Sequence, residues 1–386
     1  MSTIITAADA AEFLALVPRL AGFRPVRSVA IVPFQGRRTL GVLRADLPGD
    51  DADADSVAAT LVGMVCKVRH ADALAIVVYT DAAFSGVGAD DGGPAHGRLA
   101  QALTRAADVC GLRVAEALCV AADGWGSYLD AAQGAPRPLD ELDDTSIDER
   151  LPEELRGPLG DQAAGAELPP VDLALSERTA RALHTLDEAI DAVSHATGIE
   201  RAAHEDLARL DPLALAAACA LDDIPALFED ALEWDPARLR PFDAAALIWC
   251  LARPALRDVA LVQWASGIES GDAALDAQLR WEEGDEYPPD LAAHLWGEAD
   301  RPSAERLATA LDLVRHAAAA APRDERAGPL AVCAWLSWAL GRSTHAAWYA
   351  DQAALIEPEH GLTGILHAMI AAGHLPEWAF APPQER

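Results

Sequence analysis

Three aspartates each close a stretch of sequence that we expect to form a β-strand: Asp46, Asp81 and Asp123. In an open α/β sheet the carboxyl ends of parallel strands share one edge, and ligands bind there. Carboxylate oxygens are the ligands that Mg²⁺ prefers, and this ion often accompanies a phosphate. The alternative is structural, because Asp is common as a first loop residue that bonds its own backbone. Asp46 is the strongest candidate of the three.

Arginines are the rare positive charges of the same region. Arg24 and Arg27 lie in G-F-R-P-V-R-S, and Arg44 lies on the second expected strand. A guanidinium could bind an anionic ligand, or it could pair with a nearby carboxylate, which we favour. The candidate ligand-binding residues are therefore Arg24, Arg44, Asp46, Asp81 and Asp123, with Mg²⁺ as the cofactor that they could hold.

Tryptophans are concentrated in the C-terminal half of the chain. Trp335, Trp338 and Trp348 lie on adjacent expected helices near its end. Aromatic side chains are enriched at binding hot spots, so these three could form a groove for a partner peptide. The alternative is that they pack between helices in the core.

No catalytic signature is complete. His204-Glu205 begins H-E-x-x-H, but Ala208 replaces the second histidine. Ser127 follows a glycine, but Leu129 replaces the second glycine of G-x-S-x-G. The glycine-rich loop 85–97 matches neither G-x-G-x-x-G nor a phosphate loop, and we expect a surface loop there. The sequence therefore favours a protein that is not an enzyme.

The net charge of the chain limits the classes of partner that it can bind. The 386 residues include 30 Lys and Arg against 61 Asp and Glu, for a formal net charge of −31. Such a field repels phosphate backbones and anionic lipid, so we expect neither nucleic-acid nor membrane binding. It favours solubility, with a basic partner or a cation as the alternative.

The cysteines and the N-terminal segment bear on the cellular compartment of the protein. The six cysteines are scattered, with no C-x-x-C pair, and we expect them to be small buried side chains in a reducing compartment. The N-terminal segment has no basic leader region, and no apolar run approaches the roughly 20 residues that span a bilayer. The sequence therefore predicts a cytoplasmic protein.

The elements that must position these residues alternate in type along the N-terminal region. A helix starting near Thr6 precedes two strands, 28–34 and 38–46, which we expect to form an antiparallel hairpin. A helix, the apolar strand 73–80, a second helix and the strand 113–122 follow. Because helical crossovers give parallel neighbours, we expect a small, mostly parallel mixed sheet in an α/β domain.

The rest of the chain divides into a linker and a helical part. Prolines and acids dominate residues 134–175, which we expect to be a linker between an α/β domain at 1–133 and a helical domain at 176–386. Apolar residues after Ser176 follow a helical period, including a candidate helix at 199–209. Consecutive helices with short loops suggest stacked pairs, so we expect an all-α, helical-repeat-like domain.

Several motifs resemble a known family. They are L-x-L-V-P-R-L-A-G-F-R-P-V-R-S-V (14–29), R-A-D-L-P (44–48), W-G-S-Y (125–128), A-W-L-S-W-A-L-G-R (334–342) and A-L-I-E-P (354–358). Together they resemble the actinobacterial domain-of-unknown-function family 4192. The resemblance covers nearly the whole chain and implies a shared architecture, but no activity.

A second resemblance is local. Ala346, Ala353 and Pro358 have the spacing of the second helix of a tetratricopeptide repeat, and Ala334 matches a small residue of its first helix. About one and a half repeats are similar to that pattern. This segment supports a repeat-like helical end.

Two functions remain open at this point. The first is a protein-interaction or scaffold module whose helical part binds another protein, while the α/β domain binds a small ligand or serves as a platform. The alternative is a metal-dependent enzyme, or a binding protein, for a phosphorylated or nucleotide ligand at the carboxyl edge of the sheet.

Overall fold

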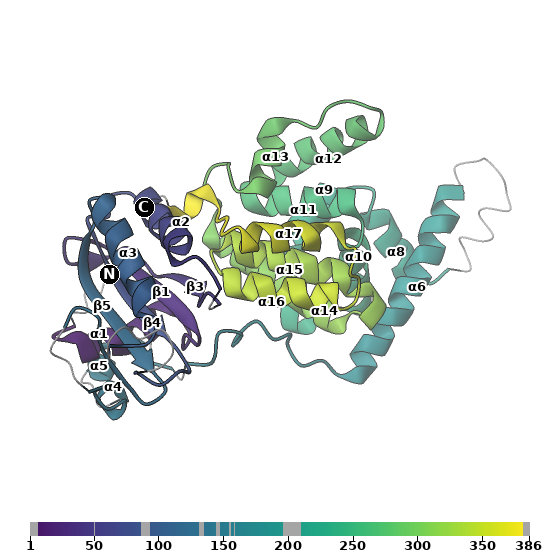
Figure 1. Ribbon diagram of the computed structural model, residues 1–386. Helices are drawn as coiled ribbons and strands as arrows, with labels where there is room; N and C mark the ends of the chain where they lie inside the picture. Colours follow the sequence, from purple (N-terminus) through teal and green to yellow (C-terminus); the bar gives the residue numbers. More distant parts are fainter. Residues whose placement is uncertain are drawn as a thin grey trace. The chain divides into compact units, whose positions relative to one another are not determined.

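The computed structural model describes residues 7–49, 51–85, 93–130, 135–143, 147–153, 156–157, 159–195 and 210–380 (Figure 1). The chain forms two compact units, and the division between Gly165 and Ala166 falls inside the expected linker segment. The first unit also takes in the last residues, from Phe380. The expected helix at 199–209 and most of the loop 85–97 lie outside the described residues.

The first unit contains a mixed sheet. Its strands are β1 (Ser28–Gln35), β2 (Arg38–Thr39), β3 (Leu43–Asp46), β4 (Ala73–Tyr79), β5 (Arg113–Ala121) and β6 (Gly124–Ser127). The order is β2-β1-β4-β5-β6, with β3 also paired to β1. The pairing of β1 with β2 and β3 is antiparallel, so the expected hairpin is confirmed.

The expectation of a mostly parallel sheet is wrong. Only β4 and β5 pair in parallel among the described strands, and the other four pairings are antiparallel. The reason lies in the order of the strands. Strands β3, β4 and β5 run in the same direction, but β1 lies between β3 and β4 and runs against both. The helical crossover after β3 therefore passes over β1 rather than reaching an adjacent strand.

Helices cover both faces of this sheet. Helices α2 (Ala54–Lys67) and α3 (Gly97–Val109) pack on the face that carries Val29 and Ile31. Helix α1 (Ala10–Ala21) packs on the opposite face, against Ala30 and Val32. The short helices α4 (Asp140–Asp143) and α5 (Ile147–Arg150) complete the unit. Strand β4 is buried along its full length, as its continuous apolar sequence predicts.

The second unit is helical. Its α-helices are α6 (Leu173–His195), α8 (Pro212–Ala220), α9 (Ile224–Ala231), α10 (Pro241–Leu251), α11 (Pro254–Ser266), α12 (Ile268–Glu282), α13 (Pro289–Trp296), α14 (Ala304–Ala320), α15 (Ala327–Ala339), α16 (Ser343–Ala354) and α17 (Gly361–Ala371). Short 3₁₀ turns lie at Pro236–Arg238, Arg323–Glu325 and Glu377–Phe380. The sequence explains where α8 and α9 begin, because in each helix an aspartate cap precedes a proline in the first turn.

Helix α15 is the centre of the second unit. Every one of its residues is buried, and it packs against α14, α16 and α17 as well as α10 and α11. In a repeat stack each unit contacts only its neighbours in the sequence, whereas α10 and α15 are far apart in the chain. The helical content is therefore as predicted, but the helical-repeat character is not confirmed.

Two further sequence expectations concern the surface. No helix within the described ranges combines the length and the apolar character needed to cross a bilayer. Cys119, Cys250 and Cys333 are buried as expected, but Cys66, Cys110 and Cys219 are exposed, which corrects the expectation for those three.

We predict that a methyl group at Gly328 destabilises the second unit. A Cβ atom there would lie 2.6 Å from the carbonyl oxygen of Leu251, at the end of α10. Gly328→Ala should therefore lower the free energy of unfolding by about 1–3 kcal/mol, as measured by urea titration. The matched control is Gly364→Ala in α17, where a Cβ meets nothing within 4 Å. That control should raise stability by up to ~1 kcal/mol, and equal effects would contradict the packing described here.

Candidate functional site

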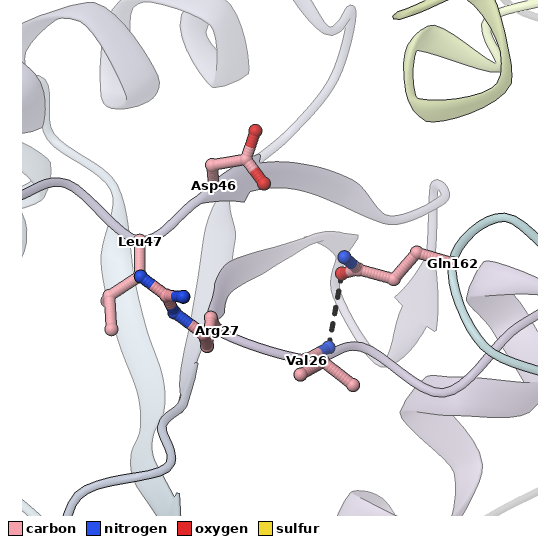
Figure 2. Close-up of a pocket in the computed structure, with 5 residues that line it drawn as sticks. All are labelled: Val26, Arg27, Asp46, Leu47 and Gln162. Carbon is pink, nitrogen blue, oxygen red and sulfur yellow. Dashed lines mark hydrogen bonds between the residues drawn. The ribbon is translucent and has the colours of Figure 1, made fainter. Parts of the chain in front are cut away.

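A pocket of about 280 Å³ lies in the first unit, at the ends of β1 and β3. Its lining residues are Val26, Arg27, Asp46, Leu47 and Gln162. Figure 2 shows Gln162 extending from its own segment towards Val26, with Asp46, Leu47 and Arg27 on the other side. The pocket therefore joins three segments that are distant in the sequence and combines a cation, an anion and an amide.

The antiparallel pairing of β1 with β3 brings two of these segments together. The register places Ser28 opposite Asp46, and Ala30 opposite Arg44. Side chains that are opposite each other lie on the same face of a sheet, so Ser28, Arg44 and Asp46 share the face that α1 covers. The motifs R-P-V-R-S-V and R-A-D-L-P thus meet because these strands pair.

Arg44 is the buried centre of this group. Its side chain is 11% exposed, its Nε donates to Ser28 Oγ at 2.8 Å, and a terminal nitrogen pairs with Asp46. An arginine stays charged in proteins, so a buried guanidinium requires acceptors of this kind. Asp46 is 85% exposed on its other side. The expectation that Arg44 pairs with a nearby carboxylate is therefore confirmed.

Gln162 completes the network from a third segment. Its Oε1 accepts from the backbone N–H of Val26 at 3.1 Å and lies 2.7 Å from Ser28 Oγ. Ser28 is fully buried, and its hydroxyl also lies 2.7 Å from the carbonyl oxygen of Val26. Because Ser28 Oγ accepts from Arg44, its own proton is available to these two oxygens. The amide of Gln162 therefore occupies a position towards which two donors point.

The sequence segment that carries Val26, Arg27 and Asp46 is rich in arginine, unlike the chain as a whole. Residues 7–49 contain six arginines and three acids, a local excess of three positive charges in a chain of net charge −31. Arg27 lines the pocket and has no ion-pair partner among the described residues, so the carboxylate pairing that the sequence favours is not found for Arg27. Its backbone is in the left-handed region, with φ 45°, and its carbonyl accepts from Leu47 N at 2.8 Å. Arg24 has an exposed side chain, while its backbone N–H donates to Gly160 O.

The structure does not gather the three predicted aspartates. Strand β1 separates β3 from β4, so Asp46 and the end of β4 are two strand spacings apart, roughly 10 Å. Asp81 is exposed, and Asp123 accepts from the backbone N–H of Phe84 at 2.6 Å, as an aspartate with a structural role in a loop does. Within the described residues no group of three or more His, Cys, Asp or Glu side chains could hold a metal ion. The donors present therefore do not fit a Mg²⁺ shared by Asp46, Asp81 and Asp123.

A polar cluster does lie beyond the parallel pair β4–β5. Thr80 Oγ1 and His96 Nε2 are 3.1 Å apart, and the Tyr128 hydroxyl donates to Ala95 O at 2.5 Å. Burial raises the pKa of Tyr128 and that of the neighbouring Cys119 thiol, the latter to about 11. Both groups therefore remain protonated near neutral pH. Their contacts hold the segment before α3 in place.

The predicted partner groove of Trp335 and Trp338 is wrong. Both side chains are buried, and their ring nitrogens donate to the carbonyls of Leu295 at 3.0 Å and His374 at 2.8 Å. A buried indole N–H needs such an acceptor, so these residues have a packing role. Trp348 is half-buried and packs against the same core, so a binding role for it stays a prediction.

Two polar residues of the hydrogen-bond network, Ser28 and Gln162, were not predicted from the sequence. Ser28 belongs to the G-F-R-P-V-R-S motif, but nothing in the local sequence indicates that its hydroxyl has a special role. Gln162 lies in the segment expected to be a linker, and no local pattern predicts that it reaches β1. The same segment is held on the first unit by the bond from Arg24 N to Gly160 O at 2.9 Å and by that from Arg19 to the Gly157 carbonyl.

The fold and the pocket define a two-part protein, with a mixed α/β domain that carries a polar pocket and a helical domain built around α15. The chain belongs to the family described as domain of unknown function (DUF4192), which matches residues 11–377. This match confirms the family that the motifs suggest. No curated protein matches the chain, and neither does any solved structure. An actinobacterial origin and a tetratricopeptide-like end stay predictions.

We predict that Ser28 supports the fold of the first unit as well as the pocket. Ser28→Ala removes the acceptor of the buried Arg44 Nε, and an unsatisfied buried donor costs about 1–3 kcal/mol. Thermal and urea unfolding should show this loss. The control is Thr60→Ala, since this exposed hydroxyl donates only to Ser56 O of its own helix. A Ser28→Ala protein as stable as this control would show that the network is dispensable.

Proposed function

We propose that the protein is a ligand-binding interaction protein: the first unit binds a small polar ligand, and the helical unit binds another protein. The pocket is the observation that carries the proposal. Two strand-end motifs and a third segment contribute Arg27, Asp46 and Gln162 to one cavity of about 280 Å³. Sites for drug-sized ligands span ~300–1,000 Å³, so this cavity suits a smaller molecule.

The same pocket favours binding over metal-dependent catalysis. The alternative of an enzyme with a shared Mg²⁺ required three converging carboxylates, and strand β1 separates Asp46 from the strand ends that carry the other two. Arginine recognises carboxylate and phosphate groups without a metal. A phosphorylated or carboxylated ligand therefore remains within this proposal, while the metal does not.

The surface of the helical unit supports a protein partner. Trp281 on α12 is 58% exposed and Trp296 on α13 is 45% exposed, and Leu279 is exposed beside Trp281 in the sequence. Residues 268–300 carry ten acids and one arginine. Exposed tryptophans in acidic surroundings suit a partner that presents a basic, apolar surface. We place this activity in the cytoplasm, a proposal that the six free cysteines support.

The ligand-binding part predicts that a blocked pocket loses its ligands. Val26 lines the pocket and is partly exposed, so Val26→Trp should fill the cavity without removing a hydrogen bond of the side chain. Small polar fragments that bind the wild-type chain in saturation-transfer NMR should lose binding to this variant at least tenfold (roughly 1.4 kcal/mol). The control is Val109→Trp at the exposed end of α3. Fragments that bind both variants equally would place the ligand elsewhere.

The interaction part predicts that the two exposed tryptophans hold the partner. A double variant, Trp281→Ala with Trp296→Ala, should lose the proteins that the wild-type chain captures from its native extract. High salt should release the same proteins from the wild-type chain, because the surface is acidic. Leu355→Ala changes an apolar residue just after α16 that is 71% exposed, and it is the control. Capture that survives in the double variant, or a wild-type chain that captures nothing, would refute this part.

A further inference from the structure

Two hydrogen-bond donors of the first unit converge on one acceptor. The backbone N–H of Val26 and the hydroxyl of Ser28 lie 3.1 Å and 2.7 Å from Gln162 Oε1. The Ser28 hydroxyl is held by the Nε of buried Arg44 at 2.8 Å. Because Arg44 Nε–H donates to the Ser28 oxygen, the single serine proton faces two acceptors, Gln162 Oε1 and the carbonyl oxygen of Val26, each 2.7 Å away. The position of Gln162 Oε1 is therefore a fixed acceptor site built from β1 and β3.

This acceptor site favours a negative charge over the neutral amide that fills it. Hydrogen bonds to a charged acceptor are roughly twice as strong as those to a neutral one. The Arg27 guanidinium lines the same pocket and has no ion-pair partner among the described residues. Gln162 thus makes the contacts that an oxyanion would make more strongly.

We propose that the pocket binds a small molecule through an oxyanion, a carboxylate or a phosphate, which replaces the side-chain oxygen of Gln162. The ligand oxygen accepts from Val26 N–H and Ser28 Oγ, and Arg27 pairs with its charge. The Gln162 side chain acts as an internal competitor that occupies the site when no ligand is bound. This inference rests on the proposed ligand-binding function and names its ligand class.

Displacement of Gln162 also changes the segment that carries it. Residues 159–165, here called the strap, are held on the first unit by Gln162 and by the bond from Arg24 N to Gly160 O. The strap ends at Gly165, which has φ 87°, and Ala166 is already part of the core of the helical unit. A bound oxyanion removes the two bonds of Gln162 and leaves the strap with fewer attachments. Ligand binding therefore loosens the residues that lead into the helical unit.

The test measures how Gln162 competes with simple oxyanions. Inorganic phosphate and succinate are titrated separately into the full-length chain at low ionic strength, with affinity from isothermal calorimetry. We expect Gln162→Ala to bind at least one of them about tenfold more tightly than the wild-type chain, because the variant has lost the internal competitor. Arg27→Ala in the Gln162→Ala background should weaken that binding by about tenfold or more. The probe that binds identifies the oxyanion as a phosphate or a carboxylate.

A third variant separates displacement from a general loosening of the pocket. Gln162→Glu places a carboxylate at the acceptor site and should abolish binding of both probes while raising the thermal midpoint at neutral pH. In the wild-type chain, saturating probe should increase hydrogen exchange in residues 159–165, and Gln162→Ala should show fast exchange there without the probe.

Two results would overturn the inference. The first is equal affinity of the wild-type chain and Gln162→Ala for the probe, which leaves the pocket as a ligand site and removes Gln162 as a competitor. The second is that neither probe binds Gln162→Ala while fragments of another class bind the wild-type pocket and lose binding in Val26→Trp. That outcome retains the proposed function and rejects the oxyanion.

Discussion

The charge of Arg44 is the constraint on which the first unit depends. A guanidinium does not give up its proton in a protein, so the mostly buried side chain of Arg44 requires acceptors within reach. Ser28 and Asp46 supply them, and both are available only because β1 and β3 pair in one register. A slip of one residue would turn Ser28 to the opposite face of the sheet and leave Arg44 without its Nε acceptor. The placement of Arg44 and the geometry of the pocket therefore both depend on the register of β1 and β3.

The orientation of Ser28 follows from the same constraint and explains the pocket. With its oxygen engaged by Arg44, the hydroxyl proton can serve only the Val26 carbonyl or the Gln162 side chain. The pocket thus has donors fixed by the core rather than by flexible surface side chains. Fixed donors recognise a ligand at a lower entropic cost than donors that must first be ordered.

The helical unit buries large aromatic side chains in its core. Helix α15 is rich in small residues, and Gly328 lets its first turn approach the end of α10 closely. Trp335 and Trp338 then fill the core, and carbonyls of distant segments satisfy their ring nitrogens. Trp281 on α12 and Trp296 on α13 lack such burial, and both are exposed.

How far the sequence predicts this structure depends on how local each signal is. The bounds of α8, α9 and α13 follow from aspartate or proline at the first turn, and the burial of β4 follows from its apolar run. The insertion of β1 between β3 and β4 is a matter of non-local pairing, so the expected parallel order was wrong. The sequence does not tell whether the tryptophans of α15 are buried or exposed, because this depends on how α15 packs against the other helices.

The candidate site shows the same division. Arg44 and Asp46 could be predicted from charge and motif, and their mutual pairing follows from their positions two residues apart on one face of β3. Gln162 could not be predicted, because its role depends on a tertiary contact across more than a hundred residues of sequence.

A crystal structure of the wild-type chain grown or soaked with the oxyanion that it binds tests the central claim most directly. We expect density for the anion within hydrogen-bond distance, about 3 Å, of Val26 N and Ser28 Oγ, with the Gln162 side chain turned away and Arg44 unmoved. An anion bound elsewhere, with Gln162 Oε1 still on Val26 and Ser28, would contradict it.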